Sequence, residues 1–85
     1  MPLEIKLTGT PFKYLQSLDK NTRNRIIEKL KEVAKVPFDP RLSQPLQGHE
    51  KRKTRVGSYR IIFEVTTQEL IVADIGPRGQ IYRKY

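Results

Sequence analysis

The segment "KRKTRVGSYRIIFEV", residues 51–65, constrains the fold more than any other part of the chain. Two runs of strand-forming residues flank the dipeptide Gly57-Ser58, and glycine at the first turn position is typical of a two-residue type II′ β-hairpin. A turn this short fixes the register and places Arg55 opposite Arg60. Because alternate side chains point to opposite faces of a strand, the hairpin is predicted to have an apolar face and a basic face.

The two faces follow from the parity of the positions. The apolar face, which we expect to meet the core, carries Thr54, Val56, Tyr59, Ile61, Phe63 and Val65. The basic face, which we expect to stay open to solvent, carries Lys51, Lys53, Arg55, Arg60, Ile62 and Glu64. Arg52 has the parity of the apolar face, so we expect it at the sheet margin, with its stem packed and its guanidinium in water.

Hydrophobic periodicity predicts the remaining elements. Strands are expected at residues 2–7, 51–56, 59–65 and 69–76, helices at 11–18 and 19–35, and a loop at 37–50. The first helix should begin with Thr10 as its cap and Pro11 as its first residue, and the second with Asp19 as its cap. This order, β-α-α-β-β-β, predicts an α+β domain: an N-terminal strand, a helical hairpin and a three- to four-stranded antiparallel sheet with the helices on one face. We expect one domain over residues 1–85.

The chain is strongly basic. Its 85 residues include 17 Lys and Arg against 9 Asp and Glu, a net charge of +8. Such a surplus indicates an anionic partner: nucleic acid, an acidic protein or a membrane surface. There is no cysteine, no signal peptide and no apolar run near the roughly 20 residues that span a bilayer. We therefore expect a cytoplasmic protein with no membrane partner.

The basic face has two interpretations. Edge strands often carry lysines that block aggregation, but a facing pair of arginines exceeds what such protection needs and favours a phosphate or polyanion site. The tail adds cations and rings, namely Arg78, Tyr82, Arg83, Lys84 and Tyr85. Rings beside cations are typical of RNA sites, where they stack on unpaired bases, although the same tyrosines would also suit ordinary strand packing.

The sequence shows neither a catalytic triad nor a set of metal ligands. His49, the only histidine, is interpreted as a loop residue, and the carboxylates are scattered. We therefore expect no metal and no cofactor. The chemistry that remains is metal-free cleavage of RNA, in which the substrate's own 2′-hydroxyl is the nucleophile. Such a site needs a base, an acid at the leaving 5′-oxygen and cations for the charge that develops on the phosphate.

The element order, the strand "GSYRIIFEV" and the ending "IGPRGQIYR" resemble the RelE/ParE superfamily of toxins from prokaryotic type II toxin–antitoxin modules, over nearly the whole chain. RelE-type members are ribosome-dependent endoribonucleases that cut mRNA and leave a 2′,3′-cyclic phosphate. ParE-type members share the fold and inhibit DNA gyrase without cutting RNA. The resemblance implies a cognate RelB-like antitoxin and, for a RelE-type member, mRNA on the ribosome as the substrate.

The resemblance also implies roles for individual residues. The catalytic set, by position, is Lys51, Lys53, Arg60, Arg78 and Tyr82. The remaining cations and ring of the hairpin and tail are expected to bind RNA: Arg52, Arg55, Arg83, Lys84 and Tyr85. Tyr82 follows Arg78 more closely than the family tyrosine does, which leaves Tyr85 as an alternative. The two lysines together with the two arginines favour the nuclease. A ParE-like gyrase inhibitor and a non-toxic basic RNA- or ribosome-binding module are the alternatives.

Overall fold

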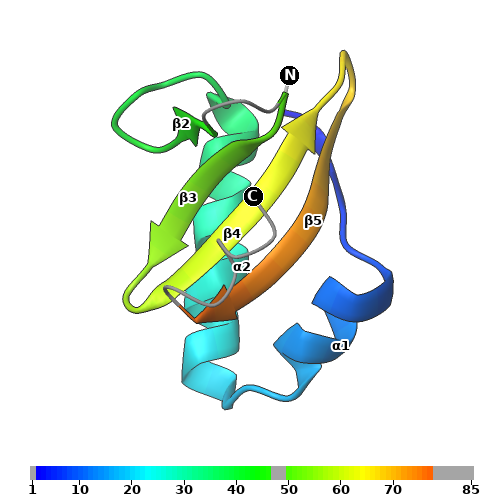
Figure 1. Ribbon diagram of the computed structural model, residues 1–85, viewed down its shortest axis with the longest axis vertical. Coiled ribbons are helices and arrows are strands. Elements are labelled where there is room, and N and C mark those ends of the chain that lie inside the picture. Colours follow the sequence, from blue (N-terminus) through cyan, green and yellow to red (C-terminus); the bar gives the residue numbers. More distant parts are fainter. Residues whose placement is uncertain (1, 47–49, 78–85) are drawn as a thin grey trace.

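A computed structural model describes residues 2–46 and 50–77. Within these residues, two helices and five strands follow one another along the chain (Figure 1). In order they are β1 (Glu4–Lys6), α1 (Gly9–Gln16), α2 (Lys20–Lys35), β2 (Gln44–Pro45), β3 (Arg52–Val56), β4 (Tyr59–Val65) and β5 (Glu69–Pro77). The helices and the three long strands thus lie where the periodicity predicts them, within one or two residues.

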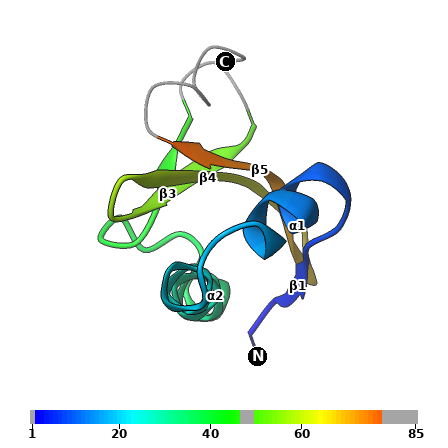
Figure 2. The ribbon, with the colours of Figure 1, turned by 90° about the horizontal axis from the view of Figure 1, so that it is seen from below.

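The strands form one mixed sheet in the order β1-β5-β4-β3-β2. Both helices lie on the same side of it (Figure 2), which confirms the predicted α+β class. The sheet differs from the expected antiparallel one at both edges. At one edge β1 runs parallel to β5, and at the other the two residues of β2, inside the segment predicted as a loop, pair with β3. Such a short pair carries no periodicity of its own, so only its contact with β3 makes it a strand.

The hairpin of β3 and β4 has the predicted register. Arg55 lies opposite Arg60, and the other pairs of the ladder follow in step. Gly57 has a φ of 58°, and no non-glycine residue among those described has a positive φ. A positive φ at the first turn position alone is what a type II′ turn requires. Glycine reaches that conformation without steric cost, so this position sets the register of the whole hairpin.

The two helix starts differ in how well the sequence predicts them. Asp19 caps α2 as expected, because its carboxylate accepts hydrogen bonds from the backbone N–H (3.0 Å) and the hydroxyl (2.7 Å) of Thr22. The predicted start of α1 is wrong: it begins at Gly9, with Thr8 in the cap position. Gly9 has a φ of 67°, so the chain turns out of β1 at the glycine, before Pro11.

The main core lies between the helices and the sheet. Its fully buried side chains come from both layers and include Leu15, Ile26, Leu30, Val33, Ile61, Phe63 and Leu70. The apolar face of the hairpin therefore meets the core, as the parity predicts. Phe12, which shares the predicted apolar face of α1, is an exception because it is 43% exposed.

The opposite face of the sheet is only partly open. Ile62 belongs to the basic face by parity, yet it is 0% exposed, because Leu46 and Ala73 pack on it in a second, smaller core. The pairing of β4 with β5 shifts by one residue between Ile62 and Phe63, a β-bulge that leaves Ala73 without a cross-strand partner. The expectation of an open face thus holds for the ends of the hairpin and not for its middle.

The contrast between two phenylalanines tests this core. Replacing the fully buried Phe63 with alanine leaves a cavity between α2 and the sheet, so we expect a loss of about 3–5 kcal/mol in the free energy of unfolding. The matched change Phe12→Ala should cost less than about 1 kcal/mol, since the ring is already half exposed. Urea denaturation followed by circular dichroism measures both. Equal losses would contradict the assignment of the core.

Candidate functional site

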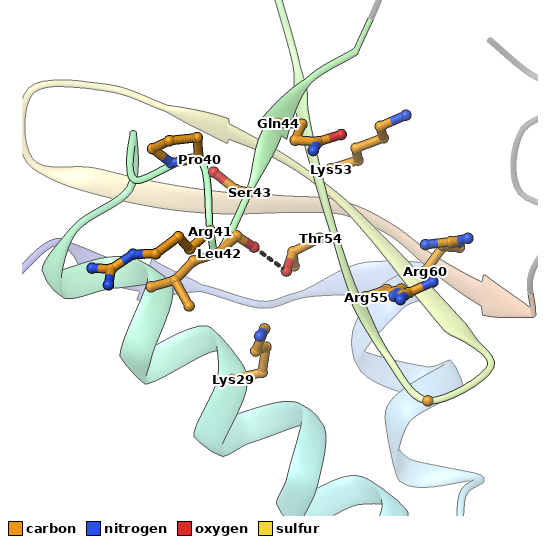
Figure 3. Close-up of a pocket in the computed structure, with 11 residues that line it drawn as sticks. Lys29, Pro40, Arg41, Leu42, Ser43, Gln44, Lys53, Thr54, Arg55 and Arg60 are labelled. Atoms are coloured by element: carbon orange, nitrogen blue, oxygen red, sulfur yellow. Dashed lines mark hydrogen bonds between the residues drawn. The ribbon is translucent and has the colours of Figure 1, made fainter.

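The hairpin brings three predicted site residues together. Lys53 and Arg55 lie on β3 and Arg60 on β4, and all three line one cleft (Figure 3). Thr54 and Ile61, which lie opposite each other in the ladder next to these residues, are buried and have the opposite parity. Alternation along the two strands therefore concentrates the positive charge on one face.

Lys51 stands slightly apart from this group. It precedes β3, and its Nζ atom lies 3.1 Å from Oε1 of Glu64, the residue that the register places opposite it. Lys51 is not among the residues that line the cleft. Of the two lysines predicted for the catalytic set, only Lys53 is therefore among the described residues that line the cleft.

The cleft has a volume of about 630 Å³ and lies at the outer edge of β3, between residues 40–44 and α2 (Figure 3). Thr54 Oγ1 donates a 2.6 Å hydrogen bond to the carbonyl oxygen of Leu42 and so ties the loop to the strand. No carboxylate is among its eleven lining residues in the described part of the chain, and five are cationic: Lys29, Arg41, Lys53, Arg55 and Arg60. The cleft is therefore suited to an anionic ligand.

Sequence reasoning missed two of these cations, Lys29 of α2 and Arg41 of the loop. Both residues lie outside the hairpin, whose alternation predicted the basic face. They line the cleft only because the loop and α2 pack beside β3. Arg41 already has a partner, because its Nη2 lies 2.8 Å and its Nε 3.1 Å from the two carboxylate oxygens of Asp39. Hydrogen bonds and charge from Arg41 lower the pKa of Asp39 to about 2.

Arg52 is held by the loop. Its Nε donates to Ser43 Oγ (3.0 Å), its Nη2 donates to the Ser43 carbonyl oxygen (3.2 Å), and its guanidinium lies over the ring of Phe38, 5.1 Å from the centroid. Ser43 is 2% exposed and donates in turn to the carbonyl oxygen of Pro37 (2.7 Å). The guanidinium was expected in water, and instead it fastens residues 37–43 to β3. The RNA-binding role of Arg52 stays a prediction.

The tail residues of the predicted site lie outside the described residues: Arg78, Tyr82, Arg83, Lys84 and Tyr85, together with His49. The last described part of β5 pairs with the start of β4, with Gly76 opposite Arg60 and Pro77 opposite Tyr59. The last described residues of β5 thus lie beside Arg60, at the same end of the sheet as the cleft.

Asp74 is a further residue that the sequence did not place. It lies opposite Ile62 in the ladder, and it therefore shares the face that carries Lys53 and Arg60. The bulge after Ile62 sets this register. This bulge was not predicted from the sequence and is a feature of how β4 and β5 pair. A carboxylate thus belongs to the basic face beside the cleft.

In residues 2–46 and 50–77, neither helix combines the length and apolarity that crossing a bilayer requires.

The sequence model of one family, described as "ParE toxin of type II toxin-antitoxin system, parDE", matches residues 5–82. No curated protein matches the sequence significantly.

Several solved structures share the fold. A double mutant of the E. coli toxin RelE in the free state has a TM-score of 0.80 and 21% identity, covering 98% of this chain and 93% of that one. The toxin–antitoxin complex RelBE2 from Mycobacterium tuberculosis has a TM-score of 0.79 and 18% identity, covering 92% of this chain and 100% of that one. The archaeal RelE–RelB complex from Pyrococcus horikoshii OT3 has a TM-score of 0.75 and 26% identity, covering 94% of this chain and 99% of that one. These similarities confirm the predicted resemblance of the fold to RelE toxins.

The contacts of Arg52 predict a structural role that can be measured. In Arg52→Met the stem stays but both hydrogen bonds to Ser43 are lost, so we expect the free energy of unfolding to fall by about 1–3 kcal/mol. The control Arg55→Met alters an exposed position on the same strand and should change it by less than about 0.5 kcal/mol. Chemical denaturation measures both variants. If Arg52→Met lost no more stability than the control, the structural role of Arg52 would be contradicted.

Proposed function

The chain belongs to the ParE toxin family of type II toxin–antitoxin systems, and on that premise we propose that this toxin is a metal-independent endoribonuclease that cleaves mRNA on the ribosome. The observation that carries the proposal is the cleft at the β3 edge, where Lys53, Arg55 and Arg60 converge and no described carboxylate is among the lining residues. Because ribosomes translate in the cytoplasm, the toxin would act there.

In the proposed reaction the 2′-oxygen of the RNA attacks the adjacent phosphorus. The new O2′–P bond forms as the P–O5′ bond breaks, and the products are a 2′,3′-cyclic phosphate and a free 5′-hydroxyl. A base takes the proton of the 2′-hydroxyl, and an acid protonates the leaving 5′-oxygen. No metal is needed, provided that cations balance the negative charge that builds on the phosphate oxygens.

The roles of individual residues follow from their places around the cleft. Lys53 lines the cleft and Lys51 does not, which makes Lys53 the better candidate for contact with the scissile phosphate. Lys51 would also bind and activate at the scissile phosphate, once the substrate displaces Glu64 from it. Arg60 would stabilise the transition-state charge. Arg78 would act at the leaving oxygen, and Tyr82 or Tyr85 would stack on a base or accept the proton.

The family match supports a second candidate function. The matching family is named for ParE toxins, and ParE-type members inhibit DNA gyrase. A gyrase inhibitor does not need a cationic cleft suited to a phosphate, so the cleft favours the nuclease.

We also propose a RelB-like antitoxin as the partner, because structures with the same fold are RelE–RelB complexes from Pyrococcus horikoshii OT3 and Methanococcus jannaschii. Its bound segment would cover the cationic cleft and reduce the repulsion between Arg55 and Arg60. In a melting experiment with the protein encoded beside this one, we expect the melting temperature of the toxin to rise by several degrees, because a ligand that binds only the folded state stabilises it. An unchanged melting temperature at saturating partner would contradict this proposal.

The cleavage proposal predicts a large effect of one arginine. In Arg60→Ala the charge opposite Arg55 disappears, and we expect the rate of mRNA cleavage on purified translating ribosomes to fall by about 10²–10³-fold. Primer extension that maps new 5′ ends measures the rate, and a circular dichroism melt checks that the variant folds. The control Lys31→Ala removes a cation of α2 that does not line the cleft, and cleavage should be retained.

Two outcomes would overturn the nuclease. The first is a toxic wild-type protein that produces no new mRNA ends. The second is an Arg60→Ala variant that cleaves as fast as the wild type. Accumulation of gyrase-cleaved DNA with intact mRNA would instead support the ParE-like function.

A further inference from the structure

The positive charge of the cleft continues around the edge of the sheet, beyond the face that carries the proposed catalytic residues. The side chain of Lys29 extends from α2 toward β3 and lines the cleft (Figure 3). The helix itself covers the core side of the sheet, opposite the basic face (Figure 2). Lys29 and Arg55 line both the cleft and a neighbouring hollow, where Arg25 joins them. A cationic surface therefore runs from Arg60 on the open face, past Arg55 at the edge, to the helix.

Among the described residues, no strand pairs with the outer edge of β3 at Arg55. The partner strand β2 pairs only with Arg52 and Lys53. The N–H of Leu46 donates to the carbonyl oxygen of Lys51, so the backbone N–H and C=O of Lys51 point away from β4, toward the outer edge of the sheet. Because this orientation alternates along a strand, the backbone groups of Lys53 and Arg55 point to the same edge. The N–H of Arg55 has the same orientation, beyond the end of β2. An anion beside it would meet a backbone donor as well as a guanidinium.

Lys29 and Arg55 also differ from their neighbours in having charges that are available. In residues 2–46 and 50–77, no carboxylate lies within ion-pair distance of either of them. By contrast, Lys31 is 3.8 Å from Glu28, and Arg41 is bound to Asp39 and points away from Arg55 in Figure 3. Glu28 and Glu32 line the neighbouring hollow and not the cleft, which makes the cleft the more favourable place for an anion.

The lining of the cleft favours nucleic acid over an acidic peptide. Apart from its cations, the described lining offers the side-chain amide of Gln44, and its larger apolar residues are Pro40 and Leu42. The hydroxyls of Ser43 and Thr54 are buried and already donate to the carbonyl oxygens of Pro37 and Leu42. Peptides gain affinity from apolar anchors at the centre of an interface, and this cleft has little to receive them. Phosphates need only cations and N–H or O–H donors.

We propose that this cleft binds the sugar–phosphate backbone of single-stranded RNA next to the reacting nucleotide, with Lys29 and Arg55 each contacting a phosphate. The proposal rests on the proposed function in one respect, namely that the RNA in the cleft is part of the strand that is cut. Binding through phosphates is independent of sequence. The cleft would therefore supply affinity and register, while Lys53 and Arg60 act at the scissile group.

Salt-dependent binding tests the proposal without cleavage. The probe is a short single-stranded RNA whose 2′-hydroxyls are methylated, so that it cannot react, and its affinity for the purified toxin is measured by fluorescence anisotropy over a range of salt concentrations. Each phosphate contact contributes about −0.7 to the slope of log K against log[salt] for single strands. We expect Lys29→Gln and Arg55→Gln each to lower the affinity and to reduce the magnitude of the slope by about 0.7.

The control is Lys31→Gln, which makes the same chemical change two residues away on α2 and outside the cleft. Its slope should match that of the wild type. If Lys31→Gln reduced the slope as much as Lys29→Gln does, the binding would come from diffuse surface charge and the proposal would be wrong. A second probe, polyglutamate, is measured in the same way. If Lys29→Gln and Arg55→Gln bound polyglutamate more weakly than the wild type but bound RNA equally well, the site would accept an acidic protein segment and the proposal would be wrong.

The outcomes for binding and for cleavage can be told apart. If the wild type binds the methylated RNA with the expected slopes but leaves mRNA on ribosomes intact, the proposed cleavage fails and the binding site stands. If the ribosome assay shows cleavage while Lys29→Gln and Arg55→Gln bind RNA as the wild type does, the nuclease stands and this inference is overturned.

Discussion

The two-residue turn at Gly57-Ser58 is the constraint on which the rest of the structure depends. Gly57 adopts a positive φ, and the turn holds Arg55 opposite Arg60. A slip of one residue would turn every side chain of one strand to the other face. Phe63 would then leave the core, and the cations would be driven into it. Burial of the apolar side chains therefore fixes the position of the charges as firmly as it fixes the core.

This coupling explains why the facing arginines are tolerated. Like charges across a ladder are unfavourable by roughly 0.2–1 kcal/mol, which is small beside the burial of Ile61 and Phe63 on the other face of the same strand. Near one end of the face the charge is balanced, since Lys51 is paired with Glu64. The described lining of the cleft includes five cations and no carboxylate, so the cleft is suited to an anionic ligand.

Residues 37–46 have a defined position only because they pack against β3, and no local sequence pattern predicts that position. The three prolines of this segment exclude a regular element of any length. Even so, Arg52 and Thr54 of β3 hold it through hydrogen bonds to Ser43 and Leu42. Once held, it forms one wall of the cleft. Arg52, whose position on the apolar side of the strand had no evident reason in the sequence, thus positions the loop.

The sequence by itself determined the class of fold, the limits of α2 and of the long strands, and the division of the hairpin into two faces. It could do so because turn chemistry and hydrophobic periodicity act within a few residues. Only the tertiary structure decided that β1 pairs with β5, that the bulge turns Asp74 to the basic face, and that Lys29 joins the cleft. These features depend on contacts between segments far apart in the chain, whose geometry is set by how the layers pack and not by any local pattern.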